Sequence, residues 1–469
     1  MTVYILGGGP VGMALVDGLV DAGGMPFTVI DRGSVLGGLA QTVHWEGVGD
    51  HDLGPHKIFS LDSGLVSRIE KLLPPSDWLT RDKVSAIYMK GHYLPYPPSP
   101  FSLASVFGLP AFFRMVFGYA RARLTSLVSS QTPSTFEEDL VHRVGRDLYQ
   151  MLFKPIALKL WGEPTGLDVK LSLGRVQTPS LTEVLARMLK IRKSSDFEAL
   201  TFRYPRGGLG RLWSAIEQKG QCKGEFVRNC AVTGFTRGDG RVTGIQCVHN
   251  GQEKTFDVGP DDFVVSTLPL ALTTRLLSDG LPEHIVDLAD RVVALNDLLL
   301  VFLHVDVQSL IKESWVFVPD PDIVFHRLSE QESFDPGMSP SGSIVCCEIM
   351  SSQNRPLAGR SDAELIADAL KGLHDMGYRN FSVLSQRVIR LPKSYPVFKS
   401  GFEAGLTEVL QHLDSINNFR TVGRQGAFNY IGTLDAMDIG YGFVRWLGQR
   451  EDSSWVEERV RTNHYPVLD

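Results

Sequence analysis

The chain has 469 residues, of which 43% are hydrophobic and 21% are charged, and its formal net charge at pH 7 is −6. This length and composition predict a soluble globular protein of about two or three domains. The acidic balance argues against a nucleic-acid polymer as a partner, because no positive field attracts phosphate chains. The chain begins directly in a strand-like run and contains no apolar run as long as a membrane span. We therefore expect a cytoplasmic protein without a signal peptide or a membrane partner.

The cysteines show no C-x-x-C spacing, and two of them are adjacent in a strand-like run. They are Cys222, Cys230, Cys247, Cys346 and Cys347. This pattern predicts reduced core residues rather than a disulfide framework or a metal site. The sequence indicates no metal centre.

The N-terminal residues carry the first chemical signal. Val3–Leu6 is a short apolar run, and the motif Gly7-Gly8-Gly9-Pro10-Val11-Gly12 follows it at once. The run predicts a buried parallel strand, and the glycines allow a tight turn into a helix whose first N–H groups face a pyrophosphate. A second strand-like run ends on Asp31, where an acid accepts hydrogen bonds from a ribose. Together these features predict a dinucleotide-binding unit, with Gly7, Gly9, Pro10, Gly12 and Asp31 at the cofactor.

The residues after Asp31 indicate which dinucleotide is bound. Gly37 and Gly38 are followed by Leu39 and Ala40. A glycine pair at this place lets a second stretch of backbone approach the cofactor closely, which is typical of FAD proteins and unusual in NAD dehydrogenases. The alternative is an ordinary turn. We predict FAD as the cofactor.

Hydrophobic periodicity predicts the elements further along the chain. Residues 1–95 have the pattern of βαβ units, and residues 100–200 are rich in helix. The predicted helices are Phe136–Leu160, Leu181–Ile191, Ala363–Met376, a pair of core helices within Phe101–Tyr119, and one opened by Tyr204–Gly210. The predicted strands are Asp257–Ser266, Asp297–Val305 and further runs between 340 and 395.

These elements predict an α/β fold with three parts: a discontinuous Rossmann-like FAD-binding domain, a helical domain and a mixed antiparallel sheet domain. The expected boundaries are 1–97 for the first FAD-binding piece, 98–200 for a helical substrate cap, 201–280 for the second FAD-binding piece, 281–400 for a sheet-containing substrate domain, and 401–469 for a C-terminal FAD-binding segment.

Motifs spread over nearly the whole chain match one known family. The matching stretches are Gly7–Gly12, Gly37–Ala40, Asp52–Ser60, Gly91–Pro97, Lys159–Trp161, Gly174–Val176, Tyr204–Gly210, Trp315–Pro319, Phe325–Arg327, Tyr395–Pro396 and Gly423–Tyr430. In this order and spacing the chain resembles the flavin-dependent UDP-galactopyranose mutases, particularly the longer eukaryotic type. More loosely it resembles the protoporphyrinogen oxidase and amine oxidase group, which shares their FAD domain.

The resemblance implies an unusual use of FAD. In that family, N5 of reduced flavin attacks the anomeric carbon of a nucleotide sugar and expels the nucleoside diphosphate; the sugar ring then opens, recloses in the other ring size and rejoins the diphosphate. We therefore expect a mutase-like isomerase of a nucleotide-linked sugar, active with reduced FAD, with NADPH or NADH as the reductant. An FAD-dependent oxidase or dehydrogenase of a small organic substrate is one alternative, and a flavoprotein with structural FAD is another. The sequence does not predict the oligomeric state.

The resemblance also implies roles for individual residues. His56 is expected near the isoalloxazine, and the alternative is a histidine packed at a domain seam. Arg175 and Arg327 are expected to hold the diphosphate by bidentate bonds, and the alternative is a salt bridge. Arg424 is expected to face the pyrophosphate or the flavin, and Thr433 to cap a helix beneath the flavin pyrimidine.

The remaining expected site residues form two sets. The further FAD-binding residues are Arg32, Leu39, Ala40, Val232, Gly423, Asp435 and Met437. The substrate-binding residues are Tyr96, Trp161, Phe317, Phe334, Tyr395 and Tyr430. For the last two tyrosines, the alternative is a core aromatic with a satisfied hydroxyl.

Four positions depart from the family pattern. Phe317 and Phe334 stand where the eukaryotic mutases carry tyrosines near the sugar phosphate. Ala157 replaces an asparagine that contacts uridine, and Ser99 replaces a glutamine after Tyr96-Pro97. Each lost hydrogen bond at a polar site costs about 1–3 kcal/mol. We therefore expect UDP-galactopyranose itself to bind poorly.

Overall fold

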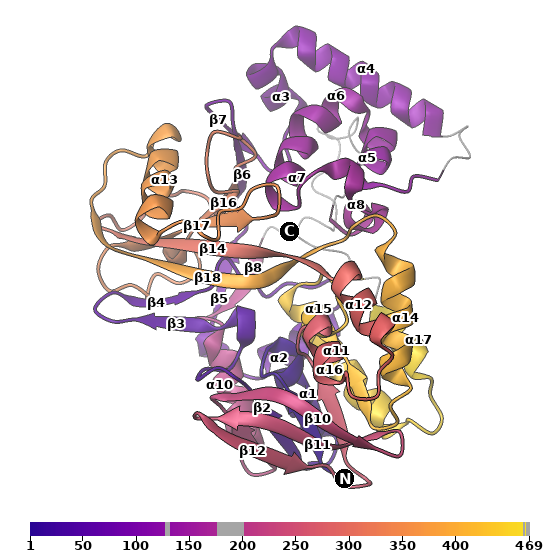
Figure 1. The fold of residues 1–469 in the computed structure, drawn as a ribbon. Helices are drawn as coiled ribbons and strands as arrows, with labels where there is room; N and C mark the ends of the chain where they lie inside the picture. The colour runs from indigo at the N-terminus through magenta and orange to yellow at the C-terminus, as the bar shows by residue number, and fades with distance from the viewer. Residues whose placement is uncertain (127–131, 176–200, 463–464, 466–469) are drawn as a thin grey trace.

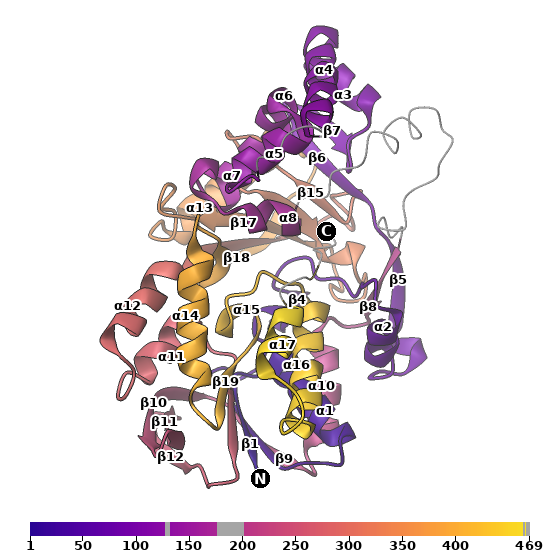
Figure 2. The ribbon, with the colours of Figure 1, turned by 90° about the vertical axis from the view of Figure 1, so that its right-hand side faces the viewer.

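The computed structural model describes residues 1–126, 132–175, 201–462 and 465. Three layers follow one another from the base to the top of the molecule in Figure 1: a parallel sheet, a large mixed sheet and a group of helices. Figure 2 shows the same order from the side. Among the described residues, no helix combines the length and the apolar character that a membrane crossing requires.

The base of the molecule is a five-stranded sheet whose strands are all parallel. Its order is β19 (Phe419–Thr421), β13 (Phe263–Ser266), β1 (Val3–Leu6), β2 (Phe27–Ile30) and β9 (Gly224–Val227). The three central strands, β13, β1 and β2, are short apolar runs because both faces of the sheet are covered. The strands of this sheet come from the N-terminal, central and C-terminal parts of the chain, so the predicted discontinuous Rossmann-like fold of the α/β class is confirmed.

Helices cover one face of this sheet, and a smaller sheet and more helices cover the other. The first face packs against α1 (Pro10–Asp21), α2 (Ser63–Glu70), α10 (Gly210–Gly220) and α16 (Thr433–Gly448). The second packs against β10 (Cys230–Gly238), β11 (Arg241–His249) and β12 (Gln252–Asp257), with α11 (Leu270–Leu276), α12 (Glu283–Val292) and α14 (Phe402–Asp414). The short helices α15 (Gly423–Gly426) and α17 (Trp455–Arg461) complete the C-terminal part.

The middle layer is a seven-stranded mixed sheet. Its order is β18 (Val383–Val397), β14 (Ala294–Val305), β17 (Ser343–Ser351), β16 (Arg327–Glu330), β15 (Trp315–Phe317), β6 (Ser85–Met89) and β7 (His92–Pro95). Alternate residues of β14 face opposite sides, as a period of two requires. Leu299, Val301 and Leu303 pack toward α13 (Asp362–Asp375), whereas Leu298 and Leu300 pack toward the hairpin of β3 (Thr42–Trp45) and β4 (Gly49–Asp52). The predicted strand Asp297–Val305 and the helix at 363–376 are confirmed.

The top layer consists of helices. They are α3 (Pro100–Phe107), α4 (Leu109–Ser126), α5 (Phe136–Val144), α6 (Arg146–Leu148), α7 (Lys154–Leu160) and α8 (Val169–Arg175). The expected helix pair within Phe101–Tyr119 is present as α3 and α4, but its assignment to the core is wrong. Phe101 and Phe117 are 77% and 71% exposed, because these helices lie at the outer end of the molecule (Figure 1).

Residues 1–95 form βαβ units only as far as Ile30. Beyond it the chain folds into the β3–β4 hairpin, β5 (Trp78–Asp82), which pairs with β8 (Thr201–Pro205), and the β6–β7 hairpin. Connections of a few residues permit only antiparallel pairing, since a parallel crossover needs a dozen or more residues. Residues 85–95 therefore belong to the middle sheet, although the expected first FAD-binding piece extends to 97. The domain boundaries stay predictions.

Two further expectations have mixed outcomes. All five cysteines are free and four are buried, but Cys222 is exposed at the end of α10 rather than in the core. The predicted helix Leu181–Ile191 lies outside the described residues.

Candidate functional site

The glycine motif after β1 forms a turn that only glycine fits. A Cβ on Gly12 would lie 2.0 Å from the Gly7 carbonyl oxygen, and Gly7 itself has a φ of +103°. The second glycine pair packs against the first: a Cβ on Gly38 would lie 3.2 Å from the Gly9 Cα. Two stretches of bare backbone therefore meet at the start of α1, where the first N–H groups of a helix attract an anion. This cradle fits the pyrophosphate of a dinucleotide such as FAD.

Asp31 stands at the end of β2 and organises this cradle. One of its carboxylate oxygens accepts a hydrogen bond from the Gly8 N–H and the other from the Gly33 N–H, both at 2.6 Å. The predicted ribose-binding acid thus also holds the glycine turn in place, a role that its spacing alone does not reveal. Its contact with a ribose stays a prediction.

The other residues expected at FAD lie around the same layer. Leu39 and Ala40 form a short 3₁₀ turn, and the Ala40 carbonyl accepts a hydrogen bond of 2.7 Å from the Trp213 indole. Arg32 is exposed beside Asp31, and Val232 lies on β10, two residues after the backbone bond of Cys230 to Asp31.

The C-terminal residues of this set bring α15 and α16 against α1. A Cβ on Gly423 would lie 2.7 Å from a Val11 methyl carbon. The Asp435 carboxylate accepts from the Gly432 N–H at 3.1 Å and so caps α16. The expectation that Thr433 caps this helix is wrong. Thr433 is the first residue of the helix, and Gly432 occupies the N-cap position before it. Met437 is completely buried in the core, so its side chain packs within the protein.

His56 lies in the turn after β4, between the parallel sheet and the middle sheet. Burial, followed by the charge of Arg327, lowers its pKa to about 4; the nearby Gly54 backbone acts in the opposite direction, and Arg424 lowers it further. The imidazole is therefore neutral at neutral pH. Its Nδ1 atom is buried and has no hydrogen-bond partner among the described residues. An unsatisfied buried nitrogen costs free energy, so this one fits a site that a ligand completes.

Arg327 begins β16 and is fixed by a buried carboxylate. Its Nε and Nη2 atoms donate to the two oxygens of Glu348 at 2.5 and 2.8 Å, and the two residues are direct partners across β16 and β17. The Glu348 side chain is 1% exposed, whereas that of Arg327 is 22% exposed. The two hydrogen bonds therefore fix the orientation of the Arg327 guanidinium. Phe317 is the residue opposite Arg327 on β15.

Arg424 lies against the aromatic rings of Tyr395 and Tyr430. Its guanidinium carbon is 4.9 Å from the Tyr430 ring centre and 5.4 Å from that of Tyr395, and its Nη1 donates to the Ile431 carbonyl. The ring centres of Tyr395 and Tyr430 are 5.3 Å apart, and Trp161 follows at 6.4 Å from Tyr430. The Trp161 indole nitrogen is buried without a partner in the described part of the chain. We call His56, Trp161, Arg327, Tyr395, Arg424 and Tyr430 the arginine–aromatic cluster.

The two other expected aromatic residues divide between the surface and the interior. Tyr96 is 39% exposed and its ring centre lies 5.2 Å from that of Phe317, next to Arg327. Phe334 is 2% exposed and packs among Phe202, Tyr204 and Trp315.

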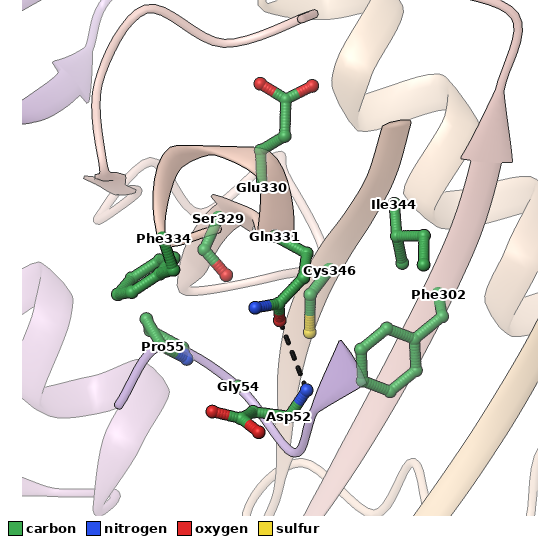
Figure 3. A pocket seen from close by; sticks show the side chains of 10 residues that line it. All are labelled: Asp52, Gly54, Pro55, Phe302, Ser329, Glu330, Gln331, Phe334, Ile344 and Cys346. Atoms are coloured by element: carbon green, nitrogen blue, oxygen red, sulfur yellow. Dashed lines mark hydrogen bonds between the residues drawn. The ribbon is translucent and has the colours of Figure 1, made fainter. Parts of the chain in front are cut away.

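A small cavity separates Phe334 from the turn that carries His56. Figure 3 shows Phe334 on one side and Gly54-Pro55 below it, while Gln331 points down and accepts a hydrogen bond of 3.1 Å from the Asp52 N–H. The cavity has a volume of about 10 Å³, which is room for a single water molecule. The cavity lies beside the turn that carries His56 and is too small for a substrate.

A buried network holds the same turn from beneath. The Asp52 carboxylate accepts hydrogen bonds from Thr42 at 2.5 Å and Tyr204 at 2.7 Å, and also from the backbone N–H of Leu209. Burial nevertheless raises the pKa of Asp52 to about 6. Thr42, Tyr204 and Leu209 therefore hold Asp52, four residues before His56.

The structure also accounts for the two polar departures from the family pattern. Ser99 is the N-cap of α3, where its hydroxyl oxygen accepts from the Ser102 N–H at 3.1 Å. Ala157 is completely buried in α7. Neither side chain is arranged to replace the missing amide contacts. Of Arg175, the structure describes only the backbone, as the last residue of α8; its side chain lies outside the described part.

Two residues of the site were missed by the sequence interpretation. One is Glu348, for which a signal exists: it is the single charged residue in the apolar strand Ser343–Ser351.

The other is Lys159, which is 5% exposed and donates to the carbonyls of Val318 at 2.7 Å and Phe325 at 3.0 Å. It ties α7, which leads to Trp161, to the loop between Phe317 and Arg327. Burial lowers the pKa of Lys159 to about 7, with a further contribution from Arg355.

The parallel sheet, the glycine cradle and the capped helices define a Rossmann-like α/β protein. Residues 5–70 match a family model described as an NAD(P)-binding Rossmann-like domain. Among solved structures, the chain is similar to a reduced UDP-galactopyranose mutase, with a TM-score of 0.84 and 20% identity over 98% of this chain and 97% of that one. It is also similar to a putative protoporphyrinogen oxidase from Exiguobacterium sp. 255-15, with a TM-score of 0.73 and 17% identity over 96% of this chain and 99% of that one.

A redesigned putrescine oxidase matches with a TM-score of 0.63 and 14% identity over 96% of this chain and 100% of that one. At these identities the similarity establishes the fold over almost the full length. The fold is thus shared with a mutase and with oxidases, as the predicted resemblance to the wider group implies. The eukaryotic mutase type stays a prediction.

Proposed function

We propose that this protein is an FAD-dependent enzyme that isomerises a nucleotide-linked sugar without net oxidation or reduction. The observation that carries the proposal is the position of His56, whose buried imidazole lies under the influence of both Arg327 and Arg424. Two cations and an unsatisfied nitrogen at the junction of the two sheets suit a site for a flavin and a diphosphate together. The full-length similarity of fold to a reduced UDP-galactopyranose mutase supports the same choice.

The glycine cradle and the start of α1 would hold the FAD pyrophosphate, with Asp31 near the ribose. When bound and reduced, the flavin supplies a nucleophilic nitrogen for the sugar carbon. His56 would contact the flavin as a neutral imidazole, because its pKa is lowered to about 4. It can therefore accept or donate one hydrogen bond without adding charge beside the cofactor.

Arg327, with Arg424 or Arg175, would hold the diphosphate of the substrate. Glu348 fixes the direction of the Arg327 guanidinium, which reduces the entropy lost when a phosphate binds. Tyr395, Tyr430 and the indole N–H of Trp161 would bind the remaining phosphate and sugar oxygens. Phe317 offers no hydroxyl beside Arg327, so UDP-galactopyranose itself is expected to be a poor substrate.

An FAD-dependent oxidoreductase acting on a small organic substrate is the second candidate. The observation that favours it is the apolar side chain of Phe317 opposite Arg327, where a polar sugar phosphate would lack a hydroxyl partner. The similar folds of a putative protoporphyrinogen oxidase and of a putrescine oxidase agree with this alternative.

The electron balance distinguishes the two candidates. Anaerobic enzyme reduced once with dithionite is mixed with a panel of nucleotide sugars, and the product is counted per flavin. Many equivalents of ring-isomerised product per flavin, with no further reductant, are the expected result. No turnover by the reduced enzyme, together with peroxide release or acceptor reduction by the oxidised enzyme in air, would establish the oxidoreductase instead.

A further inference from the structure

Two helices that flank the parallel sheet pack together unusually closely. The α12 and α14 helices lie side by side in both Figure 1 and Figure 2. A Cβ on Gly405 of α14 would lie 2.7 Å from a methyl carbon of Val292 and 3.0 Å from one of Leu288, both on α12. Glycine therefore sets the close approach of the two helices, and side chains that project from them at the surface are brought within reach of one another.

Three such side chains have atoms that ligate metals. His284 lies in the first turn of α12, and Glu408 and His412 are one turn apart on the same face of α14. The His284 Nε2 and Glu408 Oε1 atoms are 3.8 Å apart, and the two imidazole ring centres are 6.0 Å apart. One ligand atom from each residue lies within 4.8 Å of the other two.

The three groups are available to a ligand. Within the described part of the chain, the contact between His284 and Glu408 is the only ion pair or hydrogen bond that these three side chains make. The His284 and Glu408 side chains are 64% and 50% exposed, so changes of rotamer are open to them. Ligands at about 2.0–2.1 Å from a tetrahedral ion are roughly 3.3 Å apart, which small side-chain rotations would achieve from the present spacing.

We propose that His284, Glu408 and His412 bind one divalent transition-metal ion that joins α12 to α14. Two imidazoles and one carboxylate are a ligand set for zinc, nickel or copper, whereas calcium and magnesium prefer oxygen ligands alone. Because the two helices are brought together only in the folded chain, the ion would bind the folded state and stabilise it. The site is independent of the flavin site and of the proposed reaction.

The test uses the full-length protein, purified without a histidine tag and treated with a chelator. Titration with zinc chloride in a calorimeter should show one ion bound per chain, and the melting temperature should rise with zinc concentration. His284→Ala should weaken zinc binding by at least about tenfold, which is the lower limit for losing even an outer partner of a metal site. Glu408→Gln, which removes the charge but keeps the shape, should also weaken binding.

His374→Ala is the matched control, because His374 is an exposed histidine near the end of another helix, α13. It should bind zinc like the unsubstituted protein. The site would be refuted if the unsubstituted protein failed to bind zinc, or if His284→Ala and Glu408→Gln bound it with unchanged affinity. The melting temperatures of the metal-free variants, measured in parallel, separate loss of the ligand from loss of the fold.

Discussion

The cofactor side and the substrate side of the candidate site are built in different ways. The glycine cradle is made of backbone from residues 7–12 and 37–40, and its geometry depends on side chains being absent. The arginine–aromatic cluster is made of side chains from distant segments, and its two arginines are held by hydrogen bonds to Glu348 and to the Ile431 carbonyl. A cradle of backbone suits a ligand part that is common to many proteins, whereas a cluster of separately held side chains can change its specificity one residue at a time.

The largest effect is expected where a side chain is added to the cradle. Gly12→Ala would place a carbon 2.0 Å from the Gly7 carbonyl oxygen, so the turn or α1 must move. The expected result is loss of bound flavin and a destabilisation of about 4–5 kcal/mol, the upper range for one substitution. Flavin absorbance and chemical denaturation measure the two effects. Gly448→Ala, at a helical glycine with nothing within 4 Å, is the control: it should leave bound flavin unchanged and should not lower stability.

The next largest effect is expected at the Arg327–Glu348 pair. Arg327→Met leaves the Glu348 carboxylate buried without its partner and should destabilise the fold by about 3 kcal/mol, as breaking a buried ion pair does. The double variant Arg327→Met/Glu348→Gln should recover most of that stability. It should still bind a nucleoside diphosphate at least about tenfold more weakly, since the charge-assisted bond is lost.

Denaturation and calorimetry on the same three proteins check this prediction. Equal stability of the single and double variants would show that Glu348 carries no uncompensated charge. Unchanged diphosphate affinity in both variants would show that Arg327 only forms a structural salt bridge and does not bind the diphosphate.

A smaller change in stability is expected when the pH is raised through the pKa of Glu332, which lies beside the start of β17. Burial raises the pKa of Glu332 to about 7, although Ser343 and the Ile344 N–H donate to its carboxylate. The folded protein therefore holds this proton more tightly than the unfolded chain. The resulting stability is fully present below the unfolded pKa of 4.5 and is lost as the pH rises through about 7.

The loss should amount to about 2–3 kcal/mol across that pH range. Glu332→Gln should be less sensitive to pH by this amount, as measured by denaturation at a series of pH values. Parallel profiles of the two proteins would contradict the prediction.

The smallest effect is expected at Trp161. Its indole nitrogen has no partner in the described part of the chain, so Trp161→Phe should lose packing against Phe136 and Tyr430 but no hydrogen bond within the protein. It should weaken substrate-analogue binding by about 1 kcal/mol if the indole donates to a ligand. Trp455→Phe is the matched control: that indole donates to Asp414 at 2.9 Å, so its loss should lower stability and leave binding unchanged.

The glycine turn and the position of Asp31 could be predicted from the sequence, whereas their contacts with a cofactor stay predictions. Gly7, Gly12 and Asp31 lie where the strand–turn–helix pattern puts them, and the discontinuous fold is confirmed. The errors arise where tertiary packing decides: α3 and α4 are helices as predicted but lie outside the core, and Thr433 yields its capping role to Gly432. The local sequence pattern predicts whether a segment is a helix or a strand, but it says little about which other segments pack against it.

The glycine motif and the apolar run before it by themselves determined β1, the turn and the start of α1, because backbone sterics over a few residues allow little else. The partners of His56, Arg327 and Arg424 depend on the register of β15, β16 and β17 and on how α7 and α15 meet that sheet. Sequence spacing carries no information about such contacts, since residues as distant as 56 and 424 become neighbours only when the layers pack. The same holds for His284 and Glu408, which only the close packing of α12 and α14 brings together.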